Sequence, residues 1–327
     1  MAAAQPKVWF ERSVLPDLVD EVARQATMLG PATATPDEPY TALGGADGIV
    51  ASVRRYDSAV MDLAPRLRVI SRTGIGYDKV DLAAATERGI AVYNTPDGPT
   101  ISTAEHTITL MLMVAKNVKR SEADLRSGGS DLYAGHVGIE MRGKVLGLVG
   151  YGRIARRVAD IAAGLGMRIL AFDPYLDQDA FANTGRAASL TDLLGTADVV
   201  SVHVPLTEQT EGLFGEDAFT SMKPGAVFLN TARGGLVDLD ALQAALDSGR
   251  LFGAGLDVTQ PEPLPPGHPL LDRIDVVVTP HVAAGTAEAK RRIFLAAFEQ
   301  VIQVLSGERP TNLVNPEVWD RLAPAAS

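Results

Sequence analysis

Gly147-Leu-Val-Gly150-Tyr-Gly152-Arg-Ile-Ala155 is the stretch of sequence that decides the fold. It carries the G-x-G-x-x-A fingerprint of dinucleotide-binding turns, between an apolar run typical of a buried strand and a helical pattern. Gly150 permits the tight turn, Gly152 lets the backbone approach a diphosphate, and Ala155 lets helix and strand pack closely. Free amides at the start of the helix then favour the anion, so the stretch predicts a Rossmann unit; a glycine turn without a ligand is the alternative.

An acidic residue follows the next predicted strand. Arg168–Phe172 ends directly in Asp173, where a carboxylate accepts hydrogen bonds from the adenosine ribose. The nearest basic residue after it is Arg186. Because a carboxylate would repel a 2′-phosphate, the sequence predicts NAD rather than NADP as cofactor.

Strand-like runs alternate with helical patterns along most of the chain, which is typical of parallel sheets built from βαβ units. One series precedes a break near Asn94–Pro99, and a second series begins at Val145. A further helix is predicted over 287–305. We assign it to the domain of the first series, because the domain of the second series is already complete without it. We therefore predict two doubly wound parallel-sheet domains of the α/β class. A Rossmann NAD-binding domain, 101–285, is inserted into a split flavodoxin-like substrate domain, 1–100 and 286–327.

The segment after the break predicts a helix over about 102–120. Its middle, Ile108–Ala115, is apolar on every face, so it has to be buried all round. A core helix is one explanation. A face covered by a second subunit is the other, and it predicts a homodimer.

Composition excludes several classes of function. The 327 residues carry a net charge of −10, which argues against nucleic acid and anionic membrane surfaces as partners. The chain has no cysteine, so disulfides and thiolate chemistry are excluded. No cluster has metal-ligand spacing, so we expect no metal, and with no apparent signal peptide or membrane span we expect the cytoplasm.

A series of motifs follows a fixed order along the chain. Besides the glycine fingerprint, the motifs are Arg72-Thr-Gly-Ile-Gly-Tyr-Asp78, Asn94-Thr-Pro, Ala104-Glu-His-Thr107, His203-Val-Pro-Leu, Asn230-Thr-Ala-Arg-Gly-Gly-Leu-Val-Asp238, Leu256-Asp-Val-Thr-Gln-Pro-Glu-Pro263 and Thr279-Pro-His281. With these motifs the chain resembles one enzyme family, the D-isomer-specific 2-hydroxyacid dehydrogenases, from about Asp47 to Val318. The resemblance implies hydride transfer between NAD and C2 of a small 2-hydroxy or 2-keto acid.

Three residues match the family's catalytic arginine, glutamate and histidine, and their chemistry suits the reaction. Arg233 offers a permanent charge and a planar fork for the substrate carboxylate. His281 suits proton transfer to the carbonyl oxygen, because histidine side chains ordinarily titrate near neutrality. Glu262, paired with His281, would stabilise the protonated ring.

Further site residues are expected around these three. The turn Gly74-Ile75-Gly76 offers backbone amides to the substrate carboxylate, unless it is an ordinary loop, and Arg72 either supports that turn or forms a surface ion pair. The resemblance implies cofactor contacts from residues that follow the strands: Arg153 and Ile154 at the diphosphate, Val204 and Pro205 beside the adenine half, and Thr231, Ala232 and Asp257 toward the nicotinamide.

The remaining histidines are expected to have lesser roles. Glu105 and His106 begin the apolar helix and are interpreted as structural, whereas His136 and His268 are interpreted as bystanders. Two interpretations of His203 stay open: its side chain lines the cofactor cleft, or it has no contact with the cofactor.

The resemblance favours a small unphosphorylated substrate such as hydroxypyruvate or glyoxylate. In a phosphoglycerate dehydrogenase, the alternative, we would expect an arginine just after Ile49-Val50, where Ser52 stands and Arg54 and Arg55 are displaced. An alternative of another class is an NAD-sensing corepressor-like binding protein.

Overall fold

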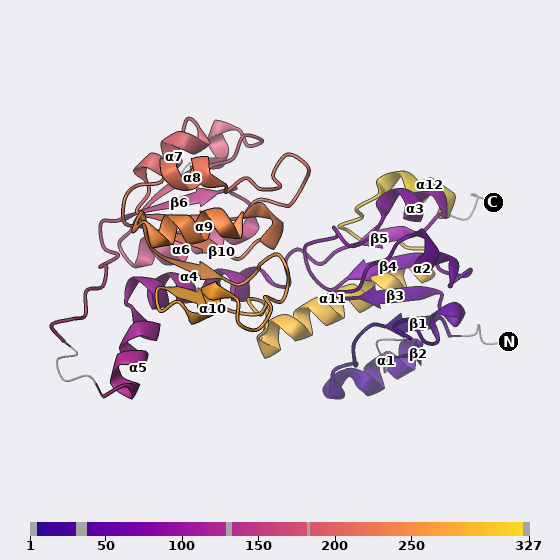
Figure 1. Cartoon of the computed structure of the whole chain (residues 1–327). Helices are drawn as coiled ribbons and strands as arrows, with labels where there is room; N and C mark the ends of the chain where they lie inside the picture. The colour runs from indigo at the N-terminus through magenta and orange to yellow at the C-terminus, as the bar shows by residue number, and fades with distance from the viewer. Residues whose placement is uncertain (1–4, 31–37, 129–132, 182–183, 323–327) are drawn as a thin grey trace. The chain divides into compact units, whose positions relative to one another are not determined.

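The computed structural model describes residues 5–30, 38–128, 133–181 and 184–322. The chain divides into two compact units (Figure 1). Unit 1 combines Met1–Pro99 with Ala287–Ser327, and unit 2 is the continuous segment Thr100–Thr286. The chain thus leaves unit 1 once and returns to it with its last segment.

Unit 1 is built on a parallel sheet of five strands in the order β2-β1-β3-β4-β5. This is the flavodoxin-like order that the sequence predicts. The short edge strand β2 was not predicted, because Thr27-Met28-Leu29 contains only one β-branched residue. The strands are β1 (Lys7–Phe10), β2 (Thr27–Leu29), β3 (Gly48–Ala51), β4 (Val69–Arg72) and β5 (Ala91–Tyr93).

The C-terminal helix α11 (Ala287–Leu305) packs on β3 and β4 of unit 1. Its apolar side chains recur with helical spacing, and Phe294 and Phe298 both lie beside Phe10 of β1. A Cβ on Gly48 would lie 2.6 Å from Val301 Cγ1, so the helix and sheet approach closely. The other helices of unit 1 are α1 (Val19–Gln25), α2 (Ser58–Asp62), α3 (Leu82–Glu87) and α12 (Trp319–Leu322).

Unit 2 is built on a parallel sheet of seven strands in the order β12-β11-β10-β9-β6-β7-β8. The strand order reverses between β6 and β9, as the doubly wound fold of the sequence prediction requires. The strands are β6 (Val145–Val149), β7 (Arg168–Phe172), β8 (Gly185–Arg186), β9 (Val199–Val202), β10 (Ala226–Asn230), β11 (Leu251–Leu256) and β12 (Val276–Val278).

Helices cover both faces of the unit 2 sheet (Figure 1). Leu146 and Leu148 of β6 join the core beneath α4 and α6, whereas Val145 and Val149 join the core on the opposite face. This alternation follows from the period of two in a strand. The helices are α4 (Thr100–Ala115), α5 (Val118–Arg126), α6 (Arg153–Gly164), α7 (Leu190–Thr196), α8 (Glu216–Ser221), α9 (Leu239–Asp247) and α10 (Pro269–Asp272).

The helix predicted over 102–120 is in fact two helices. α4 ends at Ala115, and Asn117 adopts a left-handed φ of 49° before α5 begins. Leu110 and Met111 of α4 are fully buried by unit 2 itself, so most of the apolar face needs no second subunit. Neither α4 nor any other described helix has the length and apolarity to span a bilayer.

Candidate active site

The site residues that the sequence predicts in unit 2 all follow the carboxyl ends of its strands, apart from Glu262, which lies farther along the loop after β11. In an open parallel sheet this edge is where ligands bind. The predicted site residues of unit 1 stand at the corresponding edge of its own sheet, at the end of β4 and in the turn after it.

The fingerprint turn has the conformation that glycine is required for. Gly150 has a φ of 88°, and a Cβ at this position would lie 2.8 Å from the carbonyl oxygen of His203 and 3.0 Å from Val204 Cγ1. A larger residue would therefore force the loops after β6 and β9 apart.

The start of α6 fits the diphosphate of a dinucleotide. Gly152 is the N-cap residue, and as a glycine it has no side chain with which to cap the helix. A Cβ on Gly152 would meet no described heavy atom within 4 Å, so open space lies in front of the first amides. Arg153 begins the helix and is exposed, whereas Ile154 is half-buried. The residues present thus fit an anion at this helix N-terminus, as the diphosphate of NAD requires.

Two backbone amides fix the Asp173 carboxylate at the end of β7. Tyr151 N donates to Oδ2 and Tyr175 N donates to Oδ1, each at 3.0 Å. Both oxygens keep a lone pair for a ribose hydroxyl. Arg186 is held by Gln178 Oε1 at 3.3 Å and lies over the Phe181 ring.

A buried asparagine that the sequence reasoning did not assign shapes the Arg233 loop. The side chain of Asn230, 0% exposed, donates to Arg233 O at 2.8 Å and accepts from Ala232 N at 3.0 Å. Arg233 Nη1 donates to Ala232 O at 2.7 Å, which sets the direction of the guanidinium. Thr231, also buried, is 2.8 Å from Thr107 Oγ1 of α4.

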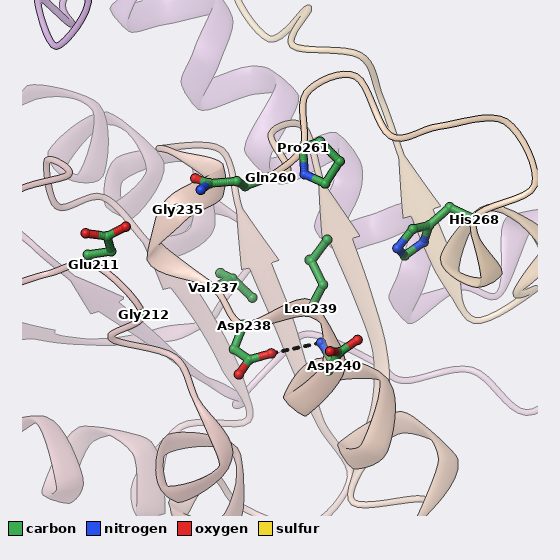
Figure 2. A pocket seen from close by; sticks show the side chains of 10 residues that line it. All are labelled: Glu211, Gly212, Gly235, Val237, Asp238, Leu239, Asp240, Gln260, Pro261 and His268. Carbon is green, nitrogen blue, oxygen red and sulfur yellow. Dashed lines mark hydrogen bonds between the residues drawn. The ribbon is translucent and has the colours of Figure 1, made fainter.

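The Arg233 loop lies directly against the segment that leads to Glu262. A Cβ on Gly234 would be only 2.1 Å from the carbonyl carbon and oxygen of Thr259. A pocket of about 390 Å³ is lined by Gly235, Gln260 and the start of α9. Figure 2 shows the residues that line it. Its lining includes Glu211, Asp238 and Asp240, so this pocket is unsuited to an anionic acid.

The structure brings Glu262 and His281 together. His281 Nδ1 lies 2.8 Å from Glu262 Oε1, and both side chains remain accessible, at 47% exposed for the histidine and 37% for the glutamate. Among the described residues, none forms a hydrogen bond with Nε2 of this ring. The pair can therefore orient the ring and still present a nitrogen for proton transfer.

His281 adopts an uncommon backbone conformation that Asp257 holds in place. Its φ is 55°, which costs about 1–3 kcal/mol for a residue other than glycine. His281 N donates to Asp257 O at 2.7 Å, and the amides of Val282 and Ala283 donate to the Asp257 carboxylate at 2.9 Å each. Because hydrogen bonds to a charged group are each worth about 1.5–3 kcal/mol, these contacts outweigh the strain.

The Asp257 carboxylate is 1% exposed and ionised. Burial by itself would raise its pKa. The net shift is nevertheless downward, because polar contacts with His106, with Thr279 and with the amides of Val282 and Ala283 favour the charged form. This carboxylate therefore holds the loop of His281 in place. Its contact with the cofactor, which the resemblance implies, stays a prediction.

His203 stands behind the fingerprint turn. Its Nε2 lies 2.9 Å from Ser201 Oγ, which is fully buried. Burial lowers the pKa of His203 to about 4, so the ring is neutral at pH 7. Val204 is half-buried and Pro205 is exposed beyond it.

In unit 1 the glycine turn is anchored by Thr95, another residue that was not assigned. Gly74 N donates to Thr95 Oγ1 at 2.8 Å, so this amide is used within the chain and does not point outward as predicted. The amides of Ile75 and Gly76 donate to no other described residue and stay available. Arg72 is 8% exposed, and its Nε donates to Gly76 O at 3.1 Å, a contact that supports the turn.

The fold and the site define a dinucleotide-binding protein with a hydrogen-bonded histidine and glutamate at the carboxyl edge of its sheet. The chain belongs to the family of D-isomer specific 2-hydroxyacid dehydrogenases: the NAD-binding domain of that family matches residues 108–283.

Individual relatives agree with this assignment. The chain is 40% identical over 268 residues to the D-3-phosphoglycerate dehydrogenase of Archaeoglobus fulgidus, covering 82% of this chain and 51% of that protein. It thus spans about half the length of such relatives. It is 37% identical to the glyoxylate reductase of Thermofilum pendens, with 96% of both covered. The solved TT0316 protein of Thermus thermophilus has a TM-score of 0.86 at 40% identity, covering 94% of this chain and 99% of that one.

Proposed function

We propose that the chain is an NAD-dependent D-2-hydroxyacid dehydrogenase, or 2-keto acid reductase, with His281 as its acid–base residue. The observation that carries the proposal is the 2.8 Å contact between His281 Nδ1 and Glu262 Oε1. NADH, held at the start of α6 and by Asp173, would supply the hydride to C2 of the substrate. His281 donates the proton to the carbonyl oxygen, and Glu262 stabilises the protonated ring before that transfer.

Each unit carries one candidate contact for the substrate carboxylate. In unit 2 it is the Arg233 guanidinium, whose planar fork matches a carboxylate. In unit 1 it is the pair of amides at Ile75 and Gly76, for which the described residues provide no acceptor. Because the net charge of the chain is −10, such local donors are what lets an anionic acid bind.

The proposed substrate is a small unphosphorylated acid of the hydroxypyruvate or glyoxylate type. The match to a glyoxylate reductase over 96% of both chains supports it. Phosphoglycerate is the second candidate, because relatives named for that activity are also 40% identical.

The testing experiment measures NADH and NADPH oxidation with glyoxylate, hydroxypyruvate, pyruvate and 3-phosphohydroxypyruvate. Turnover with glyoxylate or hydroxypyruvate, lost by at least about 100-fold in His281→Ala while NADH still binds, supports the proposal. If no acid is reduced but NADH binds, the corepressor-like alternative is favoured. If His281→Ala stays within tenfold of the unmodified protein, the acid–base assignment is wrong.

A homodimer and a cytoplasmic location stay proposals. Apolar side chains exposed on unit 2, among them Leu125 at 67% and Val137 at 70%, support a surface that a second copy covers. Sedimentation equilibrium would test the dimer, since a single species of monomer mass contradicts it.

A further inference from the structure

A histidine of α4 lies against the loop that carries His281. His106 Nε2 is 2.9 Å from Thr279 Oγ1 and 3.5 Å from Asp257 Oδ1. Thr279 Oγ1 in turn is 2.6 Å from Asp257 Oδ1. The side chain of His106 is 21% exposed, so the contact is largely shielded from solvent.

Counting protons fixes the direction of these hydrogen bonds. A threonine hydroxyl has one hydrogen, and Thr279 donates it to Asp257, whose ionised carboxylate accepts only. Thr279 Oγ1 therefore has to accept from His106, which carries a hydrogen on Nε2. The direction of donation runs from α4 to the loop after β12 and ends on the carboxylate.

The same carboxylate holds the backbone of the His281 loop. It accepts from the amides of Val282 and Ala283, the two residues after the left-handed His281. Asp257 Oδ1 accepts from Thr279 and from Val282 together. A change in the Thr279 contact therefore moves the acceptor that fixes the residues next to the acid–base ring.

We propose that His106 is a positioning residue for His281 that acts through Thr279 and Asp257. The proposal rests on the proposed function, in which His281 transfers the proton. Sequence reasoning interpreted His106 as merely structural, and that interpretation makes a different prediction: any side chain that fills the space would serve.

The test compares His106→Gln with His106→Leu. Glutamine places an amide N–H near the position of Nε2, whereas leucine fills the space without a donor. We expect His106→Leu to lower kcat about tenfold with little change in NADH affinity or KM, and His106→Gln to stay within about threefold. His136→Leu is the matched control, since His136 contacts the α5 residue Ser121 and not the site.

A double variant shows whether the residues form one chain of contacts. His106→Leu combined with Thr279→Val is expected to be no slower than Thr279→Val alone, because both remove the same contact. Multiplying losses would overturn the proposal, as would a His106→Gln that is as slow as His106→Leu or a His106→Leu with unchanged kcat.

Amide hydrogen exchange gives a readout that does not need turnover. The amides of Val282 and Ala283 are expected to exchange faster in His106→Leu than in His106→Gln. If the unmodified protein reduces no 2-keto acid, the proposed function fails. The hydrogen-exchange rates of these amides still test whether His106 positions the loop. Equal exchange in both variants would contradict it.

Discussion

His281 and Glu262 form a hydrogen-bonded pair although 19 residues separate them in the sequence. The loop of Glu262 follows β11, and His281 follows β12, the neighbouring parallel strand. Adjacent strands end at the same edge of the sheet, which brings the two side chains together. The contact occupies Nδ1 and leaves Nε2 for chemistry.

Glu262→Gln keeps the shape of this contact and removes its charge. We expect keto-acid reduction at neutral pH to fall roughly tenfold or more, because the protonated ring loses its carboxylate partner. Steady-state kcat measured across pH checks this, with the exposed Glu208→Gln as control. An unchanged profile would mean that the pairing has no part in proton transfer.

Arg233→Lys retains a positive charge but loses the planar fork and the bond from Nη1 to Ala232 O. We expect kcat/KM for the keto acid to fall by roughly 100-fold, with NADH affinity little changed. Arg157→Lys, on the exposed side of α6, is the matched control. A rate within threefold of the unmodified protein would show that bidentate contact is unimportant.

Asp173→Ala is expected to weaken NADH binding roughly tenfold and to raise the ratio of NADPH to NADH use, because the acceptor for the ribose is lost and a 2′-phosphate is no longer repelled. Fluorescence titration with both cofactors checks it. Asp179→Ala, an exposed neighbour, controls for net charge. If the unmodified protein already uses both cofactors equally, the role of Asp173 is refuted.

His203 links the stability of unit 2 to pH. The folded protein keeps the ring neutral down to a pKa of about 4, whereas the unfolded chain binds a proton near 6.5. The stabilisation is therefore fully present above pH 6.5 and is lost as the pH falls toward 4, by up to about 3 kcal/mol. Urea unfolding at pH 7 and pH 4.5 is expected to show a smaller loss for His203→Gln than for the unmodified chain. Equal losses in the two proteins would count against this role of His203.

The local elements with strong patterns were predictable. The glycine fingerprint, the strand before it and the nineteen residues of α11 were each specified by their own residues, because periodicity and turn chemistry are short-range signals. The break at Asn117 was not predicted, since neither a proline nor a glycine marks a helix end there and only the left-handed φ interrupts the helix. The strand β8, whose two residues pair with β7, was not predicted either.

The sequence by itself determined the fold class, the split order of the chain and the dinucleotide turn, because each depends on residue type and spacing. Arg233, Glu262 and His281 became candidates through their match to the motifs of the family that the sequence resembles. The tertiary structure decided which polar groups are already used within the chain. The Gly74 amide donates to Thr95 Oγ1, and the Asp257 carboxylate accepts from an amide of the His281 loop. These contacts join residues from different strands and helices, and only packing brings such residues within hydrogen-bond distance.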